Sequence, residues 1–172
     1  MKNKAVLGFF LAIVIGLTAV FVTSGPPSPA DSLYQEIGRI NQNALNEVKG
    51  QYFLLHFWAK WCEPCTDEIP KLVEFARTVS EKPFQKPLKI LAVSLDPSLE
   101  EARQILPNRG RNLPANFILA LDPDHKFAEK MGSYQYPETY LINPKGEIQE
   151  KWVGVQKWTQ PEVFEFFRKK LL

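Results

Sequence analysis

The chain has 172 residues, 45% of them hydrophobic, and a formal net charge of +2. This length is enough for one domain with a hydrophobic core and short for two. Because neither sign of charge forms a long run, the composition argues against a nucleic acid as partner. The two cysteines belong to a single motif, so a framework of structural disulfides is excluded.

The chain begins with two lysines and an apolar stretch from Ala5 to Thr23. At the rise of an α-helix, this stretch is long enough to cross a membrane. The preceding positive charges predict a cytoplasmic N-terminus and an extracytoplasmic, or periplasmic, location for the rest. We therefore predict that residues 1–23 are a membrane anchor or signal. A cleaved signal peptide is the alternative, with cleavage at Val22-Thr23-Ser24 or Ser28-Pro29-Ala30, although its apolar region usually has only ~7–15 residues.

Residues 24–31 are rich in proline and predict a semi-rigid linker between the membrane and a domain that spans 32–172. The first element of that domain is predicted to be a helix capped by Asp31 or Ser32. Its apolar positions, which follow helical spacing, are Leu33, Ile37, Ile40 and Ala44. Residues 45–50 are then expected to form the turn into the first strand of the core.

The run from Tyr52 to Phe57 is apolar and rich in aromatic residues, which predicts a strand buried on both faces of a sheet. A few residues later come Cys62 and Cys65, which are separated by two residues. From Cys62 onward, the apolar residues change to helical spacing at Ile69, Leu72, Val73 and Ala76. The cysteines therefore lie where a strand ends and a helix begins.

This position has consequences for the chemistry of the two thiols. A thiol at a helix N-terminus feels the positive end of the helix dipole, which favours the thiolate and lowers the pKa. Cys62 is therefore the predicted nucleophile. Cys65 lies one turn further into the helix and is expected to be more shielded, as a resolving cysteine should be. Such a pair exchanges disulfides with a partner through a mixed disulfide.

The rest of the chain predicts alternating helices and strands that end in a hairpin and a last helix. The helix after the cysteines contains Pro70 and runs to about Val79, and a strand follows over Leu88 to Leu95. The next predicted helix starts at Asp96-Pro97-Ser98 and carries Leu99, Ala102, Ile105 and Leu106, and it is followed by a strand over Phe117 to Leu121 and by a helix capped by Asp122-Pro123-Asp124 and stopped at Gly132. A hairpin is predicted over 139–142 and 148–153, with its turn at Asn143-Pro144-Lys145-Gly146. The last predicted helix is capped by Thr159 and has Pro161 in its first turn. This pattern indicates an α/β sandwich with a mixed sheet.

Here the sequence resembles a known family. The segment Phe57-Trp58-Ala59-Lys60-Trp61-Cys62-Glu63-Pro64-Cys65, followed by Glu68 and Pro70, resembles the active site of thioredoxin-fold proteins of the membrane-anchored TlpA, ResA and CcmG (DsbE) branch. Leu91 to Asp96 is similar to the central strand of that branch, and Tyr136 to Asn143 to its "PET" segment. The resemblance covers residues 45 to 172 and is more specific than a Cys-x-x-Cys motif alone. It implies a thioredoxin-like three-layer α/β/α sandwich with a central mixed β-sheet and a TlpA-type central insertion.

The resemblance also implies an activity. Proteins of this branch are exported thiol–disulfide oxidoreductases, and we expect this one to reduce cysteines of extracytoplasmic client proteins, such as apocytochrome c in cytochrome c maturation. A membrane electron donor would return the dithiol to its reduced form. We expect a monomer without a cofactor.

Two alternatives to this function stay open. The first is a disulfide-forming oxidant, which needs an unusually stabilised thiolate. The second is a metal-handling module on the same fold, although copper-delivery relatives space their cysteines by three residues. A structural zinc site wants four ligands, and beyond the cysteines the chain offers His56 and His125, which are not at finger-like spacing.

Three residues near the cysteines are predicted to tune them. Glu63 and Pro64 lie between the cysteines, and a carboxylate there opposes the helix dipole, raises the cysteine pKa and favours reduction. Glu68 lies three residues after Cys65, on the same helical face. The resemblance implies a role for Glu68 in proton handling, whereas its ordinary interpretation is a solvated helix charge.

The resemblance implies substrate contacts in a second segment. Pro137 is expected to be the cis proline that faces the active-site disulfide, leaving the Tyr136 backbone free to pair with an extended substrate. The alternative is a proline that merely ends a loop. Trp61 is expected at the rim of the substrate site, and Tyr136 is expected to be either a selectivity contact or a rim residue.

His56 departs from the family pattern. The matching position holds a buried aspartate in thioredoxin and commonly an asparagine in the TlpA-like branch, so the resemblance assigns no role to a histidine. It is either a satisfied core residue or a proton relay for Cys65. In the second case, resolution of the mixed disulfide should rise with pH through the histidine range near ~6.5.

Overall fold

The computed structural model describes residues 28–172. The predicted anchor or signal over 1–23, and the linker as far as residue 27, lie outside the described residues. Within residues 28–172, no helix combines the length and the apolar character needed to cross a membrane.

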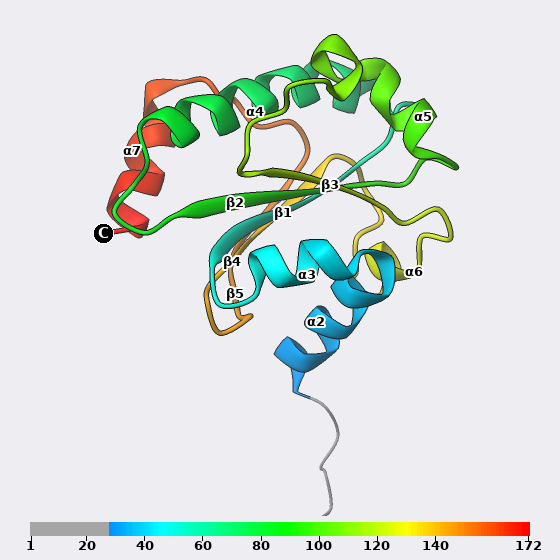
Figure 1. Cartoon of the computed structure of the whole chain (residues 1–172), viewed down its shortest axis with the longest axis horizontal. Coiled ribbons are helices and arrows are strands. Elements are labelled where there is room, and N and C mark those ends of the chain that lie inside the picture. The colour runs from blue at the N-terminus through cyan, green and yellow to red at the C-terminus, as the bar shows by residue number, and fades with distance from the viewer. Residues whose placement is uncertain (1–27) are drawn as a thin grey trace, which may run out of the picture.

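A single mixed sheet forms the centre of the described part of the chain (Figure 1). Its order is β3-β2-β1-β4-β5, and its strands are β1 (Tyr52–Trp58), β2 (Leu88–Ser94), β3 (Phe117–Leu121), β4 (Glu138–Ile142) and β5 (Ile148–Val153). β2 is parallel to β1 and to β3, whereas β4 is antiparallel to β1 and to β5. The predicted strand at 117–121 and the predicted hairpin are both confirmed.

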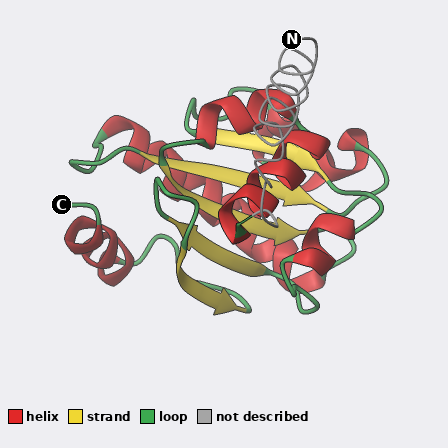
Figure 2. Cartoon of the chain, turned by 90° about the horizontal axis from the view of Figure 1, so that it is seen from below, coloured by secondary structure: helices red, strands yellow, loops and turns green. Residues whose placement is uncertain are grey.

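Helices cover both faces of this sheet and make the predicted three-layer sandwich. One face carries α2 (Pro29–Ile40), α3 (Gln42–Val48) and α6 (Lys126–Lys130), and the other carries α4 (Glu63–Glu81) and α7 (Pro161–Lys170). Figure 2 looks onto the first of these faces, with the strands behind the helices. The segment between β2 and β3 adds α5 (Leu99–Ala102) and the 3₁₀ turns η1 (Arg103–Ile105) and η2 (Pro107–Gly110).

β1 is the middle strand, and its side chains point alternately into the two layers. Phe57 packs edge-on against Phe127 of α6, with ring centroids 5.2 Å apart. His56 points the opposite way, towards Trp158, which in turn packs against Phe75 of α4. Because both faces are covered, residues 53–58 are all buried, as the apolar run predicted.

The N-terminal helix differs from our prediction in two ways. It begins at Pro29, and its cap is Ser28, whose hydroxyl accepts a hydrogen bond from the Asp31 backbone while the Asp31 carboxylate accepts one from the Ser28 backbone. The predicted cap at Asp31 or Ser32 is therefore wrong, and residues 29–31, which we assigned to the linker, are helical. The helix also breaks at Asn41, because that side chain caps a second helix by accepting from the Ala44 backbone.

Three later helices also differ from the prediction. The N-cap of α6 is His125 and not a residue of Asp122-Pro123-Asp124, although the Asp122 carboxylate accepts a hydrogen bond from the Ala128 backbone. The helix expected after Ser98 is one α-helical turn followed by 3₁₀ turns, because Leu106 is extended before Pro107, as residues that precede proline tend to be. The last helix has Gln160, not Thr159, at its N-cap, although Pro161 occupies the first helical position as predicted.

Candidate active site

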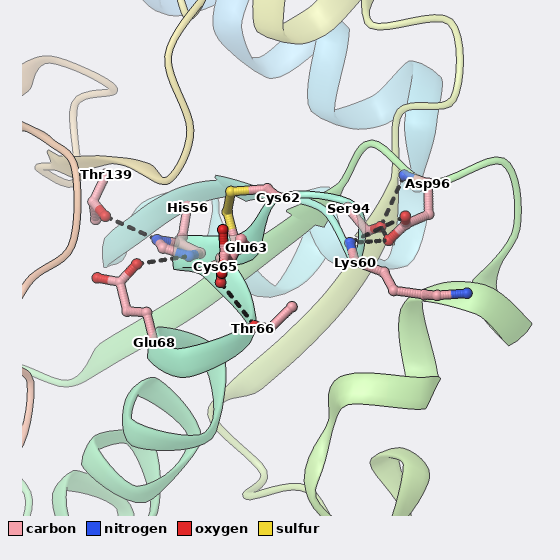
Figure 3. The surroundings of a disulfide bond; sticks show 10 residues. All are labelled: His56, Lys60, Cys62, Glu63, Cys65, Thr66, Glu68, Ser94, Asp96 and Thr139. Atoms are coloured by element: carbon pink, nitrogen blue, oxygen red, sulfur yellow. Dashed lines mark hydrogen bonds and ion pairs between the residues drawn. A yellow bond between two sulfur atoms is a disulfide. The ribbon is translucent and has the colours of Figure 1, made fainter.

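Cys62 and Cys65 form a disulfide with an S–S distance of 2.08 Å (Figure 3), so the structure shows the oxidised protein. Cys62 is the N-cap residue of α4, and its carbonyl accepts hydrogen bonds from the backbones of Cys65 and Thr66. The side chain of Cys62 therefore lies at the positive end of the helix dipole. Cys62 is 7% exposed and Cys65 is fully buried, which is the order of shielding that we predicted.

The residues between the cysteines face solvent. Glu63 and Pro64 are the first two residues of α4, and both are exposed. Proline is suited to this position because its missing N–H would have no partner within the helix. The Glu63 carboxylate lies in the first turn, near the positive end of the helix dipole, as the prediction of its tuning role requires.

Asp96 holds the loop that leads to Cys62. Its two carboxylate oxygens accept hydrogen bonds from the Lys60 backbone at 3.1 and 2.9 Å, and one of them also accepts from the Ser94 hydroxyl at 2.8 Å. We predicted Asp96 only as the start of a helix and missed this role. The available signal was a carboxylate directly after a buried parallel strand, since the carboxyl ends of β1 and β2 meet at one edge of the sheet.

Glu68 is fully buried, which excludes the interpretation as a solvated helix charge. Its Oε1 accepts hydrogen bonds from the Gln156 backbone and from Trp158 Nε1, both at 2.7 Å. Its Oε2 has no hydrogen-bond partner among the described residues. Burial raises the pKa of Glu68 to about 7, although the two hydrogen bonds and the positive charge of Lys71 act in the opposite direction.

His56 is also fully buried, and its Nδ1 lies 2.8 Å from the hydroxyl oxygen of Thr139. Its Nε2 lies 3.9 Å from Oε2 of Glu68 and, within residues 28–172, has no hydrogen-bond partner. Burial lowers the pKa of His56 to about 3. This pKa lies well below the histidine range near ~6.5 in which a relay at His56 was expected to act, because desolvation disfavours the imidazolium.

The tertiary structure brings these two groups together in a way that the sequence did not show. β1 and β4 pair with His56 opposite Thr139, whereas we predicted the pairing of β4 with β5 alone. Trp158 and Gln156 come from the loop after β5 and reach Glu68 across 90 and 88 positions of the chain. We missed Thr139, Gln156 and Trp158 as site residues, and nothing in the periodicity of their segments points to them.

An aromatic cluster flanks the disulfide on the outer side of the domain. Trp61 is 57% exposed, stacks on His125 at 6.2 Å and meets Tyr136 edge-on at 6.0 Å. His125 Nε2 lies 3.1 Å from the Leu95 carbonyl, which it reaches as a donor, and the Tyr136 hydroxyl donates to the backbone of Ser133. The structure thus places Trp61 and Tyr136 together and adds His125, to which the sequence assigned no role.

Pro137 follows directly after this cluster, and its side chain is buried. The Tyr136–Pro137 peptide bond is cis, as the resemblance implied. The carbonyl of Pro137 accepts a hydrogen bond from the Gly154 backbone, which joins this loop to the end of β5.

The disulfide lies in the first turn of a helix, at the edge of a mixed five-stranded sheet that is covered on both faces. This arrangement defines a thiol–disulfide oxidoreductase of the thioredoxin-like class. The comparison with protein families agrees with this. Residues 29–151 match the model of the AhpC/TSA family, and the chain belongs to that family.

Individual relatives are named as thiol–disulfide oxidoreductases or interchange proteins. The chain is 30% identical to the thiol-disulfide oxidoreductase ResA of Bacillus subtilis over 163 residues, which cover 86% of this chain and 85% of that protein. It is 27% identical to the sporulation thiol-disulfide oxidoreductase A of the same organism, over 93% of this chain and 99% of that protein. A DsbE-type thiol:disulfide interchange protein of Chlorobium tepidum shares the fold, with a TM-score of 0.58 and 24% identity over 74% of this chain and 85% of that one.

Proposed function

We propose that this oxidoreductase is exported, stays tethered to the membrane through residues 1–23, and reduces cysteines of extracytoplasmic client proteins. The uneven exposure of the two cysteines at the start of α4 is the observation that carries the assignment of roles. The apolar stretch before the domain supports the tether. Glu63 in the first turn of α4 supports the reducing direction, because its charge disfavours a thiolate at the same helix end.

The proposed reaction starts from the reduced dithiol. The Cys62 thiolate attacks one sulfur of a client disulfide, so that a Cys62–client bond forms, the client S–S bond breaks, and the other client sulfur leaves as a thiolate that is protonated by solvent. Cys65 then loses its proton and attacks Cys62, which forms the Cys62–Cys65 disulfide and releases the second client thiolate. Two electrons pass from the dithiol to the client, and a membrane electron donor would return two electrons later.

Glu68 is the proposed acceptor for the Cys65 proton. Both side chains are buried, and they lie one turn apart on the same face of α4. Burial disfavours a thiolate at Cys65, so a nearby base should speed the second step. A carboxyl group with a pKa of about 7 is suited to this task near neutral pH, because it accepts a proton readily and gives it up again.

The exposed aromatic cluster is the proposed contact for clients. Trp61 and Tyr136 offer flat apolar surface beside Cys62, and Pro137 lies next to them. An extended client segment fits such a site, since the rings contact side chains and the Tyr136 backbone can pair with the segment. Apocytochrome c before haem attachment is the proposed client, as the resemblance of the cysteine and Pro137 segments to the TlpA, ResA and CcmG branch implies.

Trapping of mixed disulfides tests the roles of the cysteines. With Cys65→Ala, Cys62 should hold clients in stable mixed disulfides, whereas Cys62→Ala should trap none. Non-reducing electrophoresis followed by mass spectrometry of the captured partner identifies the client. Equal trapping by both variants would overturn the assigned roles.

Membrane fractionation tests the tether, and a redox titration tests the direction. The protein should stay in carbonate-washed membranes and be digested by protease added from outside the cytoplasm. A soluble product that starts near residue 25 or 31 would show that the apolar stretch is a cleaved signal.

The redox titration should give a reduction potential near the reducing end of the thioredoxin-like range, about −270 mV. A potential near about −120 mV would indicate an oxidant.

A further inference from the structure

The inner side of the disulfide contains two polar atoms that face one another and have no hydrogen-bond partner within the part of the chain that the structure describes. They are Oε2 of Glu68 and Nε2 of His56, 3.9 Å apart, and both side chains are fully buried. Each residue uses its other polar atom in a hydrogen bond, Glu68 with Gln156 and Trp158 and His56 with Thr139. Two buried orphan atoms at this separation are costly, but a single proton between them satisfies both.

We propose that His56 is a positioning residue that acts through Glu68: when Glu68 takes the proton of Cys65, neutral His56 accepts a hydrogen bond from the new carboxyl O–H. This inference rests on the proposed role of Glu68 as base. It assigns His56, where the family pattern has no histidine, a function other than the relay that we first considered.

The hydrogen bonds of Glu68 determine which oxygen receives the proton. Oε1 already accepts two N–H groups at 2.7 Å, from the Gln156 backbone and the Trp158 indole. A proton on Oε1 would compete with these donors, so the carboxyl proton belongs on Oε2. Nε2 of His56 is the polar atom that faces Oε2 (Figure 3), and a further approach of about 1 Å makes a normal hydrogen bond.

The hydrogen bond between His56 and Thr139 allows a tautomer in which Nε2 is free to accept. The imidazole is neutral, because burial lowers its pKa to about 3, so it carries one N–H. If Nδ1 carries the hydrogen and donates to Thr139, the lone pair of Nε2 points at Glu68. Of the charged groups around Glu68, Lys71 on α4 favours the carboxylate, while the loop after β5 contributes the neutral donors of Gln156 and Trp158.

NMR titration of the oxidised protein tests this arrangement without any client. With carboxyl-¹³C-labelled glutamate, the titration of Glu68 is followed in the wild type and in His56→Asn, whose shorter side chain keeps a polar group for Thr139 but does not reach Glu68. Loss of the acceptor removes a hydrogen bond that stabilises the protonated carboxyl, so the pKa of Glu68 should fall by about 0.5–1. An unchanged or higher pKa would overturn the proposal.

The tautomer of His56 provides a second readout that a merely structural role would not produce. At a pH below the titration of Glu68, the ¹⁵N spectrum of the wild type should show a neutral imidazole with hydrogen on Nδ1. Thr139→Ser retains the hydroxyl and should preserve this tautomer, whereas Thr139→Val removes the acceptor of the Nδ1–H and should weaken the preference for it. A protonated imidazole, or an Nε2–H tautomer in the wild type, would contradict the proposal.

The kinetics of resolution separate this inference from the function on which it rests. In a stopped-flow experiment with a model mixed disulfide on Cys62, the pH at which resolution is half-maximal should fall in His56→Asn by the same amount as the NMR pKa. If the pKa of Glu68 measured by NMR falls in His56→Asn while the pH of half-maximal resolution is unchanged, Glu68 is not the base. The proposed role of Glu68 then fails, whereas its contact with His56 is supported. If neither moves, the role of His56 fails and the roles of the cysteines are unaffected.

Discussion

The two sides of the disulfide have opposite physical characters, although each includes a histidine. On the inner side, beside Cys65, Glu68 and His56 are fully buried and leave one polar atom each without a partner among the described residues. On the outer side, beside Cys62, the half-buried His125 has a backbone partner and supports the exposed ring of Trp61. Burial thus separates the groups that we propose to handle the proton from those that we propose to contact clients.

The difference also affects how each side contributes to stability. A charge on the inner side is deprived of water, so the ionised form of Glu68 costs stability that the fold must supply elsewhere. In the outer cluster the ring of Trp61 is mostly exposed, so it should contribute little to the stability of the fold. Substitutions on the inner side should therefore change the pH dependence of stability, and those on the outer side should change client binding.

The largest expected effect comes from Glu68→Gln. The pKa of Glu68 is about 7 in the folded protein against an ordinary value of 4.5, so its contribution to stability is fully present below pH 4.5 and is lost as the pH rises through about 7. Between pH 4.5 and pH 9 the unfolding free energy of the wild type should fall by about 3 kcal/mol because of Glu68, whereas that of Glu68→Gln should not show this fall. Urea unfolding at pH 4.5 and pH 9 measures the difference; the same loss in both proteins would contradict it.

Trp158→Phe should have the next largest effect, because it removes the indole N–H from Glu68 and leaves a small cavity against Phe75. We expect a loss of about 2 kcal/mol in unfolding free energy, together with a higher pKa of Glu68. Urea unfolding and the carboxyl titration measure the two changes. A variant as stable as the wild type, with the pKa of Glu68 unchanged, would show that the hydrogen bond from Trp158 to Glu68 contributes little to stability or to that pKa.

Asp96→Ala tests the loop that joins the two sides. Without the carboxylate, the Lys60 backbone N–H and the Ser94 hydroxyl lose their partner, so we expect about 1–2 kcal/mol of destabilisation. Because this loop positions Cys62, the first attack on a model disulfide should slow more than resolution by Cys65. An equal slowing of both steps would point to a general loss of structure.

The smallest effect on stability is expected from Trp61→Phe, the outer counterpart of the substitution at Trp158. The ring of Trp61 is mostly exposed, so unfolding free energy should change by less than about 0.5 kcal/mol. The KM for a peptide disulfide should rise about two- to fivefold, and kcat should stay nearly constant, because the smaller ring offers less contact area. A change of kcat without KM would place Trp61 in the chemistry instead of the rim.

Several parts of the fold and the site were predictable because their signals are local. The change from a buried apolar run to helical spacing at Cys62 depends on residues within one element, and the turn at Asn143 to Gly146 depends on four adjacent residues. Helix ends were less predictable. Ser28, Asp31 and Ser32 are all acceptable caps, and the reciprocal hydrogen bonds of Ser28 and Asp31 decided between them.

By itself, the sequence determined the dithiol, its position at a helix N-terminus and most of the strands and helices, since these are encoded by neighbouring residues, whereas the cis Pro137 was implied by the resemblance to a known branch. The tertiary structure alone decided the protonation chemistry around Cys65. Glu68 has a raised pKa because Trp158 and Gln156 cover it from a distant loop, and His56 is neutral because the sheet and α4 exclude water from it. A pKa depends on solvent access and on partners far along the chain, and local sequence specifies neither.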